Sequence, residues 1–117
     1  MKKTVILATL VSIFAACAST PKVATLTDTQ LTAMSPTQVN AYYADQNKSL
    51  LDNVLYNYGG DAFEAAEPIT ANMNNDLANL SRQQITRGQY NAGVQTIVAK
   101  YQQQLNAAVK ANKVNEE

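Results

Sequence analysis

The chain has 117 residues, and its 9 basic and 9 acidic side chains give a formal net charge of zero. No segment carries a basic stripe, which argues against nucleic acid as a partner. The chain contains no histidine, the side chain most often used in general acid–base catalysis, and its single cysteine has no partner for a disulfide.

The first residues have the organisation of a secretory signal. Lys2 and Lys3 form a positive segment, and a mostly apolar run follows over residues 4–14. This run is too short to span a bilayer as a stable helix. We therefore predict that residues 1–16 are a signal peptide that takes no part in the fold.

The signal ends in the sequence FAAC at residues 14–17, which resembles the lipobox of bacterial lipoproteins. In that family a large apolar residue and two small residues precede a cysteine that is diacylated and becomes the new N-terminus. Phe14 departs from the usual leucine. The resemblance implies that Cys17 is the lipid attachment site. Ordinary signal-peptidase cleavage at ACA is the alternative, but an exported protein with one unpaired thiol is unusual.

The residue after the cysteine bears on the location. In bacterial lipoproteins an aspartate there tends to retain the protein in the inner membrane, and here Ala18 follows Cys17. For a Gram-negative host, the resemblance therefore implies the periplasmic face of the outer membrane. Residues 17–25 lack periodicity and contain Pro21, which predicts a short tether, and we assign residues 26–117 to one helical domain.

One pattern occurs three times, as LTDTQL at residues 26–31, MSPTQV at 34–39 and ITRGQY at 85–90. Each copy has an apolar residue, a Ser or Thr, a Gln three residues later and then another apolar residue. This is a capping box with a hydrophobic staple, in which both polar side chains satisfy backbone N–H groups at a helix start. A repeated recognition motif is the alternative. Because two copies open long amphipathic runs, we predict N-caps at Thr27, Ser35 and Thr86.

The first two starts predict a short helix over residues 27–33 and a long helix from Pro36 to about Tyr58. Pro36 suits the first helical position because it needs no N–H there. The apolar side chains close to one stripe at helical spacing are Val39, Tyr43, Leu50, Leu51, Val54, Leu55 and Tyr58. The run stops at Gly59–Gly60, which predicts a left-handed C-terminal cap.

The following segment predicts a second long helix with an interruption. Asp61 and Glu64 form a box-like start without a staple. Pro68 then either kinks this helix or starts it afresh. The stripe continues from Ile69 through Met73, Leu77 and Leu80. Polar residues 81–84 end the helix.

The last helix, from Thr86, has the cleanest apolar face. Its members are Tyr90, Val94, Ile97, Val98, Tyr101, Leu105, Ala108 and Val109. Residues 113–117 are predicted to fray. Short connections between long helices favour antiparallel neighbours, and no segment has the alternation of a strand. We predict an all-α fold, a small antiparallel helical bundle of three main helices plus a short N-terminal helix.

Nothing in the residue pattern predicts an enzyme, a cofactor or a metal site. With no histidine and with Cys17 acylated, neither the usual base nor a thiol nucleophile is present. Asp61, Glu64 and Glu67 cluster, and a divalent-cation site is one interpretation. They lack the alternation of a calcium loop, and negative charge suits a helix N-terminus.

The tyrosines supply most of the aromatic side chains. Those on the apolar stripes, which we predict to be core residues with hydroxyls reaching water, are Tyr43, Tyr58, Tyr90 and Tyr101. Tyr42 and Tyr56 lie off the main stripe, and for them an interface role is equally open.

Two functions fit these features. The first is an outer-membrane lipoprotein that acts as a non-catalytic binding or scaffolding module, with the membrane as one partner and another protein or a second copy as the other. The second is a pilotin-like chaperone of a secretion-system component, similar in size, lipid and helix content. An open apolar groove on the last helix would favour the pilotin. If instead the short helix over 27–33 covers that stripe, the scaffold is favoured.

Overall fold

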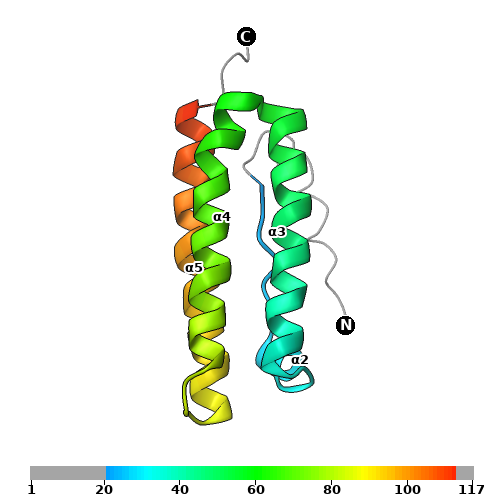
Figure 1. Ribbon diagram of the computed structural model, residues 1–117, viewed down its shortest axis with the longest axis vertical. Helices are drawn as coiled ribbons and strands as arrows, with labels where there is room; N and C mark the ends of the chain where they lie inside the picture. The colour runs from blue at the N-terminus through cyan, green and yellow to red at the C-terminus, as the bar shows by residue number, and fades with distance from the viewer. Residues whose placement is uncertain (1–20, 113–117) are drawn as a thin grey trace, which may run out of the picture.

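The computed structural model describes residues 21–112 (Figure 1). Its helices are α2 (Asp28–Thr32), α3 (Pro36–Tyr58), α4 (Gly60–Ser81) and α5 (Arg87–Asn112). No strand occurs in this range. The three long helices run antiparallel to their neighbours in sequence, which confirms the predicted all-α bundle with a short N-terminal helix. The signal peptide and Cys17 lie outside the described residues.

The three predicted helix starts are confirmed. At each start the Ser or Thr oxygen accepts the backbone N–H of the Gln three residues later, at 3.0–3.1 Å. The Gln side chain accepts the N–H of the cap residue at 2.8–3.0 Å. The capping residues are Thr27, Ser35 and Thr86. The apolar residues before the caps, Leu26, Met34 and Ile85, all pack against the core.

The junction between α3 and α4 is tighter than predicted. Gly59 has φ 98° and ψ 176°, so it is not in the left-handed helical conformation. This extended conformation with positive φ is essentially restricted to glycine. Because α4 begins at the next residue, Asp61 lies in its first turn and not at a cap, and the predicted start with Asp61 and Glu64 is wrong.

Pro68 does not start a new helix, because α4 is one helix from Gly60 to Ser81. The proline ring is exposed, so its missing N–H falls on the solvent side of the helix. Two residues further on, the Thr70 hydroxyl donates to the Glu67 carbonyl at 2.9 Å. The side of α4 that packs against the other helices is buried at Ala62, Ala66, Thr70, Met73 and Leu77.

α4 is the central helix of the bundle. It packs along both α3 and α5, whereas α3 and α5 touch each other at few points. The fully or nearly buried side chains of α3 are Val39, Tyr43, Asn47, Leu50 and Val54. Leu55 was predicted on this stripe, but it is 48% exposed because the stripe passes from Val54 to the partly buried Tyr58.

The space between α3 and α5 is filled by residues 21–34. Figure 1 shows this blue and cyan segment running between α3 and the α4–α5 pair. Pro21 and Val23 are buried, and α2 packs against α5. The predicted tether over residues 17–25 is therefore wrong for residues 21–25, which belong to the folded body. Residues 21–27, the extended part before α2, are called the strap below.

Candidate functional site

A row of polar side chains on α5 holds the strap and α2. Arg87, Asn91, Gln95 and Gln102 recur at intervals of four or seven residues, which places them on one side of the helix. Each donates to a backbone carbonyl of residues 21–34. In the strap, the row therefore binds carbonyls, those of Pro21 and Leu26, that lie outside any helix or strand.

Gln102 makes the most complete of these contacts. Its Oε1 accepts the N–H of Val23 at 2.6 Å, and its Nε2 donates to the carbonyl of Pro21 at 2.9 Å. The same Nε2 donates to Oδ1 of Asn106 at 2.8 Å. A side-chain amide that pairs with a donor and an acceptor of one backbone segment fixes both the position and the direction of that segment.

Arg87 and Asn91 bind the C-terminal end of α2. The Arg87 guanidinium donates through Nη2 to the carbonyls of Leu31 and Met34. Its Nε donates to Oδ1 of Asn91 at 3.1 Å, and Asn91 in turn donates to the Thr32 hydroxyl at 2.9 Å. A cation near the carbonyls of a helix end is favourable, which explains how a helix of 5 residues is held in place.

The strap also contacts α3. The Tyr43 hydroxyl donates to the carbonyl of Ala24 at 2.7 Å. The Tyr43 side chain is fully buried, and this desolvation, with Tyr42 beside it, raises the pKa of Tyr43 to about 12. Tyr43 therefore stays neutral and acts as a hydrogen-bond donor inside the bundle.

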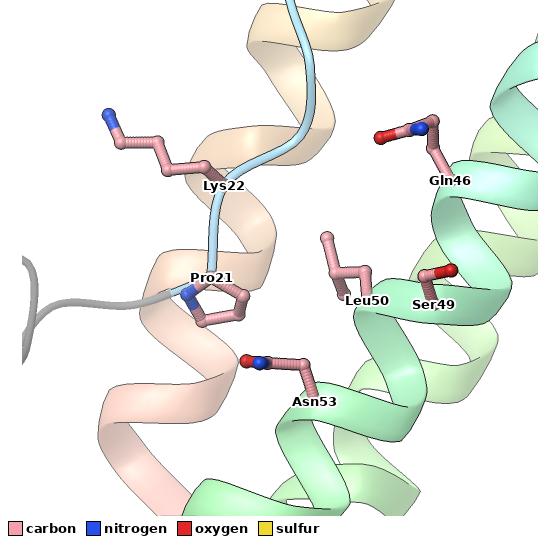
Figure 2. Close-up of a pocket in the computed structure, with 6 residues that line it drawn as sticks. All are labelled: Pro21, Lys22, Gln46, Ser49, Leu50 and Asn53. Atoms are coloured by element: carbon pink, nitrogen blue, oxygen red, sulfur yellow. The ribbon is translucent and has the colours of Figure 1, made fainter.

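Where the strap begins, it borders an open hollow of about 280 Å³ (Figure 2). Figure 2 shows Pro21 and Leu50 approaching each other across it, while the ammonium group of Lys22 points away. The remaining lining residues, Gln46, Ser49 and Asn53, are polar and uncharged. Neither an acidic nor a basic side chain points into this hollow. It is therefore a surface depression without an acid–base pair.

Two asparagine side chains of α3 join this helix to α4. Asn47 donates to Oδ1 of Asn74 at 2.7 Å, and Asn40 donates to the Ser81 hydroxyl at 3.1 Å. The Oδ1 atoms of Asn40 and Asn47 are buried and accept nothing within residues 21–112. Buried polar pairs of this kind tie the register of two helices more than they add stability.

A third polar contact joins α4 to α5. The Tyr101 hydroxyl donates to Oδ2 of Asp76 at 2.6 Å, and Lys100 lies 3.6 Å from the same oxygen. The hydrogen bond to the Asp76 carboxylate raises the pKa of Tyr101, because ionisation would place two negative charges side by side. The ammonium group of Lys100 also lies 4.8 Å from the centre of the Tyr101 ring.

The tyrosines largely follow the predictions. Tyr43, Tyr90 and Tyr101 are buried and Tyr58 is partly buried, as predicted for core residues. The prediction that their hydroxyls reach water is wrong for Tyr43, which donates to Ala24, and for Tyr90, whose hydroxyl oxygen is buried. Of the two left open, Tyr42 packs partly buried against the core with its ring 5.1 Å from that of Tyr43. Tyr56, in contrast, is 88% exposed.

The apolar stripe of α5 has partners inside the chain. Val94, Tyr101 and Leu105 are buried and Ile97 is partly buried. The stripe is therefore not an open groove at these residues, and the favoured alternative holds, because α2 folds back on α5. The strap extends this cover further along α5, and its contacts with Gln95 and Gln102 were not foreseen.

The predicted acidic cluster is a solvent-exposed group. Asp61, Glu64 and Glu67 are all exposed on α4. Across residues 21–112, no group of three or more His, Cys, Asp or Glu side chains is placed to hold a metal ion. Nor does any helix in this range have the length and apolar character needed to cross a bilayer.

The residues that bind the strap are part of a polar row on α5. Polar residues at positions 87, 91, 95 and 102 share one side of α5, next to its apolar stripe. A polar row beside an apolar stripe is also typical of a solvated helix face, so only the structure shows that this row binds the strap.

Comparison of the chain with protein-family models, with curated proteins and with solved structures gives no match.

Proposed function

We propose that the protein is a lipoprotein, acylated at Cys17 and held at the periplasmic face of the outer membrane, where its helical bundle serves as a non-catalytic binding or scaffolding module. The signal sequence and the FAAC motif support the anchor. The bundle supports the second part, because within residues 21–112 its buried polar side chains join helices to one another.

One observation carries the proposal further than the sequence does. Pro21 is buried and its carbonyl accepts a hydrogen bond from Gln102, although it lies only four residues after Cys17. Four residues span at most roughly 14 Å. The link between lipid and bundle is therefore too short to let the domain reach far into the periplasm. A body kept so close to the bilayer suits a module that presents a surface at the membrane.

The pilotin-like alternative receives less support. It needs an apolar groove for a partner's segment, and the candidate stripe on α5 is covered by α4, α2 and the strap. The exposed faces instead carry many Asn and Gln side chains, such as Gln103 and Gln104. Amide surfaces bind by hydrogen bonds and shape and give little electrostatic steering, which fits a partner already confined to the same membrane.

The anchor is tested by growing cells with an alkyne analogue of palmitate and comparing the wild type with Cys17→Ser. We expect label on the wild type alone, and loss of the Cys17→Ser protein from the outer-membrane fraction. Ser19→Ala is the matched control, because it changes a neighbouring hydroxyl and leaves the cysteine in place. Equal labelling of the Cys17→Ser protein would refute the anchor.

The scaffolding role is tested separately by chemical cross-linking in intact cells followed by mass spectrometry of the purified protein. We expect cross-links from exposed lysines of the bundle, such as Lys48 and Lys100, to one envelope protein or to a second copy. Cross-links confined to a single chain, in a protein that is nevertheless lipidated, would count against the scaffolding role and leave the anchor intact.

A further inference from the structure

The exposed apolar side chains of the described chain lie together. Within residues 21–112, the large hydrophobic residues with exposed side chains are Leu55, at 48%, and Tyr56, at 88%. They are adjacent in sequence and lie near the C-terminal end of α3. Single scattered apolar residues are normal on a surface, but here both are at one end of the bundle.

The strap begins at this same end. Pro21 and Asn53 line one hollow (Figure 2), and Tyr56 follows Asn53 by three residues, so it lies on the same side of α3 one turn nearer the helix end. Along α5, Pro21 is bound by Gln102 and Leu26 by Gln95. The N-terminal end of the strap is therefore the end nearest the C-termini of α3 and α5.

A lipid at Cys17 lies within roughly 14 Å of Pro21, because four residues separate them. We infer that Leu55 and Tyr56 form a second membrane contact, so that the bundle stands with the α3–α4 junction toward the bilayer. This inference rests on the proposed lipid anchor. The apolar ring and polar hydroxyl of tyrosine suit the headgroup region. Leu55 lies one residue earlier on α3, about 100° around the helix axis, and adds an aliphatic side chain at nearly the same height.

The charge at this end indicates the kind of lipid. Asp52, Asp61 and Glu64 are exposed there, together with two basic residues, Lys22 at the start of the strap and Lys110 in the last turn of α5. Because acidic residues outnumber basic ones here, this surface gives anionic headgroups no net attraction. The partner is therefore a zwitterionic lipid surface, and the contact depends on apolar burial and not on charge.

The chain contains no tryptophan, so Tyr56→Trp introduces a unique fluorophore at an exposed position. The lipidated full-length protein is placed in vesicles of phosphatidylethanolamine and phosphatidylcholine with or without brominated acyl chains. We expect quenching by the brominated lipid and a blue shift of the emission for Tyr56→Trp. The matched control is Gln83→Trp, which is exposed in the α4–α5 connection at the opposite end and should show neither change.

The outcomes separate this inference from the anchor. Absence of quenching for Tyr56→Trp, in a protein whose mass includes the acyl chains, overturns the membrane contact and leaves the anchor standing. A protein without acyl chains overturns both. Equal quenching for Gln83→Trp means that the bundle lies flat on the bilayer, which also overturns the proposed orientation. Quenching that rises with phosphatidylglycerol content contradicts the choice of a zwitterionic surface.

Discussion

The Oε1 atom of Gln102 accepts the backbone N–H of Val23 at 2.6 Å, across 79 residues of sequence. Val23 is 5% exposed, so this N–H has little access to water and needs a protein partner. The contact places a segment without regular secondary structure inside the bundle. The same amide also binds Pro21, the first described residue. It therefore helps to fix where the folded body begins and how far it lies from the proposed lipid.

Replacing Gln102 with alanine should therefore loosen the strap. The substitution leaves the N–H of Val23 and the carbonyl of Pro21 without this partner, and we expect a loss of about 1–3 kcal/mol of unfolding free energy. Urea unfolding measures the loss, and hydrogen exchange at the Val23 amide shows whether it is local. Gln103→Ala is the control, because Gln103 is exposed on the next residue of the same helix. Equal stability of the two variants would mean that the strap does not depend on Gln102.

The capping box at the start of α5 gives a second prediction. Thr86→Ala removes the oxygen that accepts the N–H of Gln89 at 3.0 Å, and should cost about 1 kcal/mol. Thr96→Ala is the matched control, because Thr96 is exposed in the middle of the same helix, where alanine is the better helix former. Thermal melting should thus separate the two variants in opposite directions. A neutral Thr86→Ala would show that the staple alone defines this helix start.

Local chemistry explains why the helices could be predicted from the sequence. A capping box involves residues three apart, so Ser35 and Gln38 can be recognised without knowing anything else about the fold. Amphipathic stripes likewise depend on neighbours within a few turns. Val94, Val98 and Leu105, which this spacing places on the apolar face of α5, are buried. The sequence did not decide whether α4 is one helix or two. A proline on the exposed side of a helix and a proline at a helix break give the same sequence pattern.

The strap could not be predicted because its cause is not local. Residues 21–27 have no periodicity, and they are ordered by side chains that lie about eighty residues later, such as Gln102. Leu55 was assigned to the core for a related reason. Period counting places Leu51, Val54 and Leu55 near one stripe, but only the packing of α4 against α3 decides which of them is covered. The same packing leaves Leu55 and Tyr56 at the surface.

The tight junction between α3 and α4 gives a third prediction. Gly59→Ala forces a side chain into a conformation with φ 98°, and should destabilise the bundle by about 1–3 kcal/mol although no atom lies within 4 Å of the added methyl group. Gly60→Ala is the matched control, since Gly60 has negative φ in the first turn of α4 and equally open surroundings. It should be stabilising by about 0.4–1 kcal/mol. Urea unfolding of both variants measures whether each change in unfolding free energy has the expected sign. Equal effects would mean that the strain does not lie at Gly59.

Tyr43 gives the last prediction, which concerns alkaline pH. Tyr43→Phe keeps the buried ring but removes the hydrogen bond to Ala24, and should cost about 1 kcal/mol near neutral pH. Burial raises the pKa of Tyr43 from 10.0 to about 12 in the folded state, so folding favours the neutral hydroxyl. This contribution is fully present below pH 10 and is lost as the pH rises through about 12. The stability advantage of the wild type over Tyr43→Phe should therefore shrink over this range.

Urea unfolding of both proteins at several pH values measures this advantage, with the exposed Tyr56→Phe as control. An advantage that grows with pH would show that the hydroxyl ionises more readily inside the bundle than outside it.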